Sequence, residues 1–299
     1  MELVLLFYII DEFCKEFEPR WRAERLRSGM GRNRSSRLSL SEILTIMVHF
    51  HQSHYRDFKH YYLDYVCTQL NKDFPRLVSY NRFVELMSEV NVPLVALLIS
   101  LLADSTTADY IDSTKLVVCN NRRIRRNKVF KGLAARGKSS MGWFYGFKLH
   151  LIVNEKGELV SFFVTPGNTP DNNVETVTKL AEKMQGKLFG DRGYISRDLF
   201  AALWQQGVQL ITGIKRNMKN KLLPLMDKLM LRCRSIIETI NDQLKNIEQI
   251  EHSRHRNPLN FGTNLLGGLI AYQLQPKKPE VSFSLAEQKL LKEPLLLAA

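Results

Sequence analysis

Cysteines are few in this chain, and long apolar runs are missing. The four cysteines of the 299 residues lie far apart and form no Cys-x-x-Cys pair. This spacing excludes a disulfide scaffold and a zinc ribbon, and it favours reduced thiols. The longest apolar stretches, residues 3–10 and 94–103, fall well short of the roughly 20 residues that cross a bilayer, and no signal peptide is visible. We therefore expect a soluble, cytoplasmic protein.

Acidic residues are missing between Asp112 and Glu155, and the whole chain carries a formal net charge of +13. Basic residues gather in three clusters, the first of them in this acid-free segment: Arg122, Arg123, Arg125, Arg126, Lys128, Lys131, Arg136, Lys138 and Lys148; then Arg20, Arg22, Arg25, Arg27, Arg32, Arg34 and Arg37; then Lys215, Arg216, Lys219, Lys221, Arg232 and Arg234. Any one cluster is as easily a set of solvated loops, but three together predict contacts with phosphate groups. We expect a polyanionic partner, nucleic acid first and a membrane surface second.

The N-terminal third predicts an all-α region over residues 1–105. Ser39 and Glu42 have the spacing of a capping box, and apolar residues follow them at helical intervals. His51 and His54 are three positions apart in an aromatic stretch, but no nearby carboxylate or cysteine completes a metal-binding set. We interpret these histidines as surface or core residues, with DNA contact by an aromatic and basic face as the alternative.

From about residue 106 the pattern changes to strands alternating with helices. Residues 108–112, 187–190 and 208–214 predict strands, and residues 143–153 and 158–165 predict a hairpin. Helices are predicted over residues 169–184, 196–206 and 229–250. This order predicts an α/β domain with a mixed five-stranded sheet flanked by helices over residues 106–278, and it leaves a C-terminal tail at 279–299.

Two acids, Asp112 and Asp191, follow short apolar strands in this pattern. Carboxylates at the ends of neighbouring strands can build a site, although an aspartate in this position, taken alone, is more often a turn or cap residue. A third acid, Glu238, shares one face of the last predicted helix with Arg234 and Lys245, because offsets of four and eleven residues bring all three within 40°. The alternative for this helix is a surface ladder of ion pairs.

Three carboxylates converging in a basic surface point to one chemistry. Two Mg²⁺ ions held about 4 Å apart by Asp and Glu oxygens can activate a water or a 3′-hydroxyl and stabilise the leaving oxygen of a phosphodiester. Arg234 and Lys245 would hold flanking phosphates. The residues therefore predict metal-dependent phosphoryl transfer on nucleic acid.

Several motifs occur in a fixed order, and together they are far more specific than any one. They are Tyr-Ile-Asp-Ser at Asp112, Trp-Phe-Tyr-Gly-Phe-Lys-Leu-His ending at His150, Phe-Gly-Asp-Arg-Gly-Tyr around Asp191, Arg-Ser-Ile-Ile-Glu-Thr-Ile-Asn-Asp-Gln-Leu-Lys from Arg234 to Lys245, and Arg-His-Arg-Asn-Pro-Leu-Asn-Phe from Arg254. With these motifs the chain resembles the transposases of bacterial insertion sequences that have an Asp-Asp-Glu triad, and in particular the insertion sequence 982 family. The resemblance extends to about residue 278.

This resemblance implies a ribonuclease H-like fold in which Asp112, Asp191 and Glu238 are the catalytic residues and metal ligands. It implies Mg²⁺ as cofactor, with Mn²⁺ as a substitute, and Arg234 and Lys245 as the basic members of a tyrosine-arginine-glutamate-lysine helix. Leu231 stands where that tyrosine is expected, so no role is transferred to this position. The implied partners are the terminal inverted repeats and target DNA, bound by a homodimer at the bacterial nucleoid.

Lys148 and His150 point to the same side of their predicted strand, so they either contact DNA near the metal ions or have a structural role. Two competing functions use the same residues. A hydrolytic ribonuclease H-like nuclease would cut without joining strands. A non-catalytic DNA-binding protein would use the three acids only as caps and ion pairs, and replacing Asp112 or Glu238 would then leave its function intact.

Overall fold

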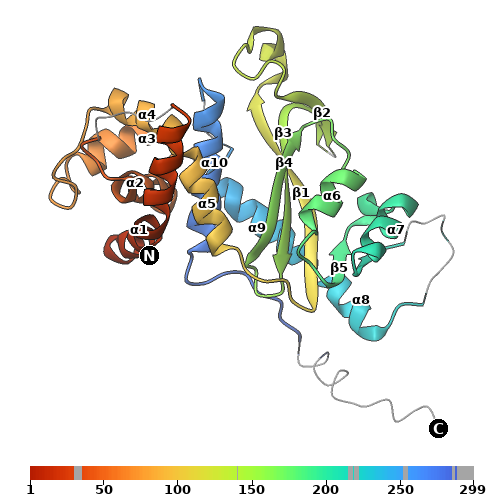
Figure 1. Cartoon of the computed structure of the whole chain (residues 1–299). Coiled ribbons are helices and arrows are strands. Elements are labelled where there is room, and N and C mark those ends of the chain that lie inside the picture. The colour runs from red at the N-terminus through yellow and green to blue at the C-terminus, as the bar shows by residue number, and fades with distance from the viewer. Residues whose placement is uncertain are drawn as a thin grey trace. The chain divides into compact units, whose positions relative to one another are not determined.

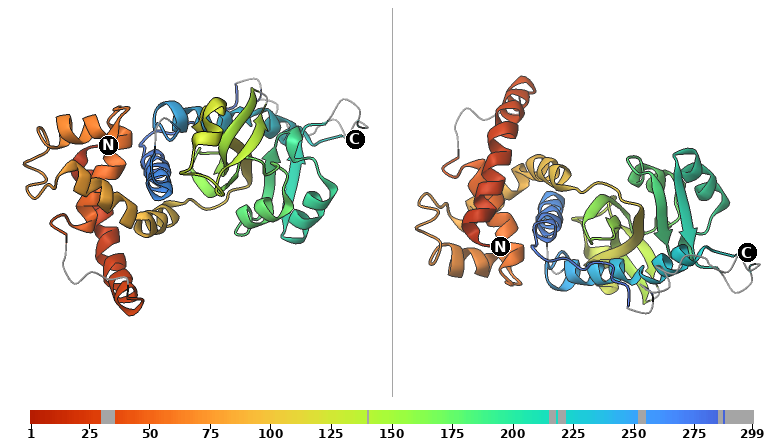
Figure 2. Two further views of the ribbon diagram at one scale, coloured as in Figure 1. Left: turned by 90° about the horizontal axis from the view of Figure 1, so that it is seen from above. Right: turned by 90° about the horizontal axis from the view of Figure 1, so that it is seen from below.

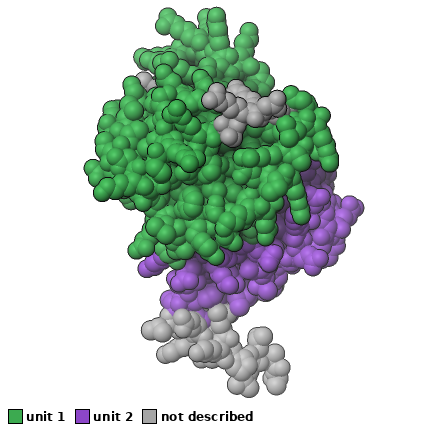
Figure 3. Space-filling view, turned by 60° about the vertical axis from the view of Figure 1, so that its left-hand side comes forward, with its two compact units in different colours: residues 1–102, 117–134, 242–276 green, residues 103–116, 135–241, 277–299 purple. Residues whose placement is uncertain are grey.

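The computed structural model describes residues 1–29, 36–139, 141–214, 218, 222–251, 255–284 and 287. The chain divides into two compact units, coloured separately in Figure 3. Unit 1 comprises residues 1–102, 117–134 and 242–276, and unit 2 comprises residues 103–116, 135–241 and 277–299. Each unit is therefore assembled from segments that are far apart in the sequence.

Unit 1 is helical, as predicted for the N-terminal third. Its elements are α1 (Leu3–Arg27), α2 (Leu40–Gln52), α3 (Phe58–His60) continued by the π-helix η1 (Tyr61–Val66), α4 (Tyr80–Glu89), α5 (Asn91–Leu101), the 3₁₀ turn η2 (Asn121–Arg126) and α10 (Pro258–Gln273). The capping box at the start of α2 is confirmed, because the Ser39 side chain accepts from the Glu42 amide and the Glu42 side chain accepts from the Ser39 amide.

Helix α10 lies at the centre of unit 1 although it comes last in the sequence. It packs against α2, α4 and α5, and its residues Leu269, Ile270, Ala271 and Tyr272 have no exposed surface. The contacts thus group α10 with the N-terminal helices, whereas the predicted α/β domain, residues 106–278, includes this helix at its end. In the described part of the chain no single helix is long and apolar enough for a membrane span; only α4 and α5 together, bent by 61°, have the required length and composition.

Unit 2 is built on one mixed sheet (Figure 1). Its strands are β1 (Ala108–Cys119), of which residues 108–116 belong to this unit, β2 (Ala135–Ser139), β3 (Gly142–Asn154), β4 (Leu159–Pro166), β5 (Gly186–Gly190) and β6 (Val208–Thr212). The strand order is β2-β3-β1-β5-β6, and β4 pairs with β3. Strands β1, β5 and β6 run parallel, and β3 is antiparallel to both β2 and β4. This is the ribonuclease H-like arrangement that we predicted, with six strands rather than five.

Helices cover both faces of the sheet, as the two views of Figure 2 show. One face carries α6 (Val174–Leu180) and α7 (Arg197–Gln205), and Ile111 of β1 packs there with Val177 and Leu199. The other face carries α8 (Leu225–Arg232) and the beginning of α9 (Ser235–Asn246), and Tyr110 donates to the Met230 sulfur of α8 there. Alternate residues of β1 therefore serve opposite faces, as the period of a strand requires.

Four observed features differ from the predicted elements. Strand β2 lies in the basic segment, where Ala-Arg-Gly-Lys-Ser contains none of the β-branched or aromatic residues that predict a strand. Strand β1 continues to Cys119, well beyond the predicted end. Helix α6 begins only after Asn173, whose side chain accepts from the Thr176 amide. The helix predicted over residues 229–250 is two helices, α8 and α9, and backbone hydrogen bonds of the i→i+3 type replace the α pattern at Cys233 and Arg234.

Candidate active site

Asp112 lies inside strand β1 and not at its end. Its side chain points to the face that carries α8 and α9, because Ile111 belongs to the opposite face. Asn241 of α9 donates its Nδ2–H to Asp112 Oδ2 over 2.9 Å. The pKa of Asp112 is raised to about 6, chiefly by burial and also by the negative charges of Asp191 and Glu238, while the Ser113 amide and the Arg234 guanidinium oppose the rise. The three predicted acids are therefore close enough to interact through their charges.

Asp191 follows Gly190, the last residue of β5, as predicted. Its Oδ1 accepts from the Gly193 amide over 2.7 Å, which caps the short 3₁₀ turn η3 (Arg192–Tyr194). The parallel register of β1 and β5 pairs Tyr110 with Phe189. Continuing this register by two residues puts Asp112 beside Asp191, on the same face and on strands about 5 Å apart.

Glu238 lies in the first turn of α9, where the positive end of the helix dipole favours a carboxylate. Arg234 Nη2 donates to Glu238 Oε1 over 2.7 Å, so the first two members of the predicted helix face do meet. Lys245 lies near the end of α9 and forms its ion pair with Glu251, at 3.3 Å from Nζ to Oε2. Arg234 alone therefore neutralises Glu238 among the described residues.

A pocket of about 410 Å³ opens beside Asp191, at the carboxyl ends of β5 and β6. Its lining residues are Gly190, Asp191, Arg192, Gly213, Leu231 and Arg234. Crevices at the carboxyl ends of parallel strands are the usual place for ligands in α/β sheets. Leu231, which stands in the place of the expected tyrosine, contributes an apolar wall to this pocket.

The chemistry of the three carboxylates fits a hard divalent cation. Oxygen ligands are those that Mg²⁺ prefers, and a bound cation would offset the burial and the neighbouring negative charges that disfavour the charged form of Asp112. As the described residues stand, no group of three or more His, Cys, Asp or Glu side chains is arranged to hold a metal ion. Asp112, Asp191 and Glu238 are instead each engaged by a protein donor, namely Asn241, the Gly193 amide and Arg234.

The family model of the transposase DDE domain matches residues 102–258, slightly more than half of the chain. The chain belongs to the DDE transposase family. A DDE transposase domain supports an enzyme of the polynucleotidyl transferase type, whose partner is DNA, and domains of this family generally use divalent metal ions. The match includes all the elements that carry Asp112, Asp191 and Glu238. No curated protein is significantly similar in sequence.

Lys148 and His150 lie on the other face of the sheet from Asp112. Ile152, two positions further along β3, packs in the core under α6 and α7, and Lys148 and His150 share its side of the strand. Lys148 Nζ donates to Asp171 Oδ1 over 2.7 Å, and only 12% of its side chain is exposed. His150 is fully buried, and its Nε2 lies 2.9 Å from Thr165 Oγ1. In this arrangement neither side chain is free to contact DNA.

Four arginines of the first basic cluster, Arg122, Arg123, Arg125 and Arg126, are exposed on the 3₁₀ turn η2 of unit 1, whereas Arg136 lies on β2 of unit 2. None of the four forms an ion pair with another described residue, so their positive charges face solvent. Much of the third cluster, namely Lys215, Arg216, Lys219 and Lys221, lies outside the described residues, as do Arg32, Arg34 and Arg254.

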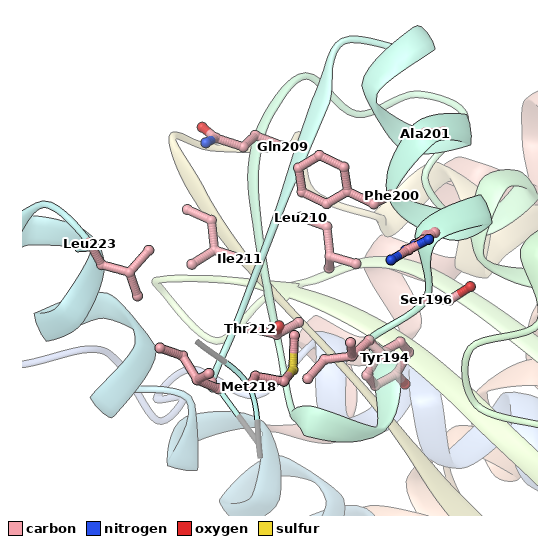
Figure 4. A pocket seen from close by; sticks show the side chains of 14 residues that line it. Tyr194, Ser196, Phe200, Ala201, Gln209, Leu210, Ile211, Thr212, Met218 and Leu223 are labelled. Atoms are coloured by element: carbon pink, nitrogen blue, oxygen red, sulfur yellow. The ribbon is translucent and has the colours of Figure 1, made fainter. Parts of the chain in front are cut away.

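A second pocket, of about 390 Å³, lies between α7 and β6 (Figure 4). Phe200 of α7 and Leu210 of β6 point into it, and its floor includes Tyr194. Its described lining is mostly apolar and contains no acidic residue, so it is not a second carboxylate site.

Sequence reasoning missed three residues near the acids. Asn241 follows Glu238 by three positions, a spacing that places both on neighbouring parts of one helix surface, and this signal could have found it. Asp171 accepts from Ser113 Oγ as well as from Lys148, but nothing in its local sequence predicts this. Tyr194 is buried, and burial followed by the charges of Asp112, Asp171 and Asp191 raises the pKa of its hydroxyl far above the usual value.

Proposed function

We propose that this protein is the transposase of a bacterial insertion sequence, in the insertion sequence 982 family. It binds the terminal inverted repeats of its element, cleaves phosphodiester bonds at the element ends, and joins the 3′-hydroxyl ends to target DNA. The observation that carries the proposal is the placement of Asp112 and Asp191 on neighbouring parallel strands, with Glu238 near enough for its charge to act on Asp112, within a DDE domain. The proposed place of action is the nucleoid in the cytoplasm.

Asp112, Asp191 and Glu238 would hold the divalent ions, Mg²⁺ with Mn²⁺ as a substitute. These ions supply neutralisation of developing charge and an activated water or 3′-hydroxyl. The chain itself orients the three acids through the two parallel strands and the first turn of α9. Arg192 and Arg234 line the pocket beside Asp191, and their guanidinium groups suit the phosphates on either side of the reacting bond.

DNA binding outside the pocket is proposed for the exposed arginines of η2, namely Arg122, Arg123, Arg125 and Arg126, and for Lys245. Lys148 would reach DNA only by leaving Asp171, and His150 only by a movement of β4 that uncovers it. Because two element ends must be processed together, we propose a homodimer on DNA.

The test incubates the purified protein with DNA bearing the element ends, in Mg²⁺ or EDTA. We compare wild type, Asp191→Asn and Asp198→Asn, whose exposed aspartate on α7 is a matched control. The expected result is cleavage and joining that require both Mg²⁺ and Asp191, with an activity at least a hundredfold lower in Asp191→Asn and unchanged in Asp198→Asn, because one ligand lost costs several kcal/mol of transition-state stabilisation.

Other outcomes would identify the competing functions. Metal-dependent cleavage without joined products would indicate a nuclease. Binding of the element ends without cleavage would indicate a non-catalytic DNA-binding protein. Cleavage that survives Asp191→Asn would show that the carboxylate site is assigned wrongly.

A further inference from the structure

Asn241 is a buried amide beside the candidate metal ligands. It lies in α9, three residues after Glu238, and only 7% of it is exposed. Its Nδ2–H donates to Asp112 Oδ2 over 2.9 Å, across 129 positions of the sequence. Asn241 is thus the residue through which α9, which carries Glu238, contacts the carboxylate of β1.

The other end of the same amide has no partner. Asn241 Oδ1 is buried and accepts no hydrogen bond from any described residue. The amide cannot simply be turned over, because its oxygen would then face the Asp112 carboxylate and two acceptors would repel each other. A buried acceptor without a donor is unfavourable, so this arrangement calls for a donor that none of the described residues supplies.

The position of this oxygen limits what the donor can be. Oδ1 and Nδ2 share one carbon, so Oδ1 lies within about 5 Å of Asp112 Oδ2. Its neighbours along the helix, Ile237 and Ile240, are buried hydrocarbon and offer no donor. A cation held at Asp112 would supply such a donor through a bound water, which the cation would polarise.

We propose that Asn241 is a positioning residue of the divalent-ion site. Its Nδ2–H holds Asp112 in the orientation that binds the ion, and its Oδ1 accepts a hydrogen bond from a water on that ion. This inference rests on the proposed metal-dependent function, and it adds a neutral residue to the three acids. Partners of this kind, which orient a metal ligand without binding the metal, commonly change metal affinity ten- to a hundredfold.

The test measures Mn²⁺ binding to the full chain by calorimetry, without DNA. Asn241→Leu removes both hydrogen-bonding ends while keeping a similar volume, and we expect Mn²⁺ to bind ten- to a hundredfold more weakly than to wild type. Asn246→Ala is the matched control, because Asn246 is an exposed asparagine of the same helix, bonded only to Asp242 among the described residues. We expect its Mn²⁺ affinity to stay within twofold of wild type.

Two further measurements separate the ways in which the idea can fail. Thermal unfolding in EDTA shows whether Asn241→Leu folds, and Asn241→Ala replaces it if it does not. Equal Mn²⁺ affinity in wild type and a folded Asn241 variant would overturn the role of Asn241 and leave the proposed function standing. If the wild-type protein binds no Mn²⁺, or if the Asp191→Asn variant binds Mn²⁺ as tightly as wild type does, the metal site and the role of Asn241 are both overturned.

Discussion

Lys148 Nζ lies 2.7 Å from Asp171 Oδ1, behind the strand that presents Asp112. The same oxygen accepts from Ser113 Oγ over 2.5 Å, and Ser113 is the residue next to Asp112 on β1. Because neighbouring residues of a strand face opposite sides, this ion pair stabilises β1 from the side away from the acids. Lys148 thereby has a structural reason to be present, whether or not it also contacts DNA.

Replacing Lys148 by Met should destabilise the protein by roughly 1–3 kcal/mol, because the Asp171 carboxylate loses the cation that neutralises it. The loss is limited because 39% of the Asp171 side chain is exposed, so water compensates part of it. The double variant Lys148→Met/Asp171→Asn should recover part of this loss. Urea unfolding of the single and double variants measures both effects. Lys179→Met, which removes an exposed partner of Glu175, is the control and should leave stability unchanged. If the stability losses of the two single variants simply add up in the double variant, Lys148 and Asp171 are not energetically coupled.

The exposed arginines of η2 should contribute to DNA affinity through phosphate contacts alone. We expect alanine at all four positions to weaken binding to any DNA sequence, and to lower the slope of log K against log salt by about 0.9 for each phosphate that is no longer neutralised. Their substitution should not change stability, because they are exposed. The control removes four other exposed charges by alanine substitution, at Lys156, Lys179, Lys183 and Lys277. An equal decrease of the slope in the two variants would mean that only net charge matters.

Glu248 should make the stability of the protein depend on pH. It is 1% exposed, and burial raises its pKa from 4.5 to about 7, against the effect of the hydrogen bond from Gln275. The raised pKa makes the protonated carboxyl group stabilise the folded protein, and this contribution to the free energy of unfolding is fully present below pH 4.5. It is lost as the pH rises through 7, by about 3 kcal/mol. Glu248→Gln should therefore be more stable than wild type at pH 8 by that order.

The comparison with Glu248→Gln isolates this group from its surroundings. His51 and His255 lie in the same unit, and burial lowers the pKa of each to about 4, so they lower the stability of both proteins alike as the pH falls below 6.5. Urea unfolding between pH 5 and pH 8 gives the difference directly. Parallel stability curves for wild type and Glu248→Gln would contradict the prediction.

Gly268 should not tolerate a side chain, although alanine favours a helix. A Cβ at this position would collide with Ile250 Cγ2 and would lie 3.4 Å from His51 Nδ1. The overpacking should cost about 1–3 kcal/mol, more than the 0.5–1 kcal/mol that alanine contributes through helix propensity. Gly262→Ala on the same helix is the control, since its Cβ meets only the end of the Asn91 side chain. Thermal unfolding should separate the two variants, and equal stability would refute the close packing at Gly268.

The class of fold was predictable because its signals are local. Alternating apolar residues predicted the strands that pair as β3 and β4, and the capping box predicted the start of α2. The break between α8 and α9 was not predictable, because neither Gly nor Pro marks Cys233 and Arg234. Strand β2 was missed for a related reason, since its pairing with β3 and not its composition makes it a strand.

The acids of the candidate site were found because each follows a recognisable local pattern or a family motif. Their surroundings depend on contacts that the sequence does not reveal. Asn241 meets Asp112 across 129 positions, and Asp171 meets Ser113 across 58. Whether Lys148 faces the acids or the opposite side depends on how β3 packs in the sheet, which the period of one strand alone leaves open.

The place of α10 in unit 1 has a consequence for synthesis on the ribosome. Helices α2 and α5 leave the ribosome early, but their central packing partner α10 follows about 170 residues after α5 and about 220 residues after α2, which takes roughly 10–45 s at 5–20 residues per second. During this interval the apolar surfaces of the N-terminal helices lack their final cover. A nascent chain can therefore pair the strands of its sheet before its first helices are packed against α10. A message cut short ahead of α10 yields a chain in which the core of the N-terminal helices is never completed.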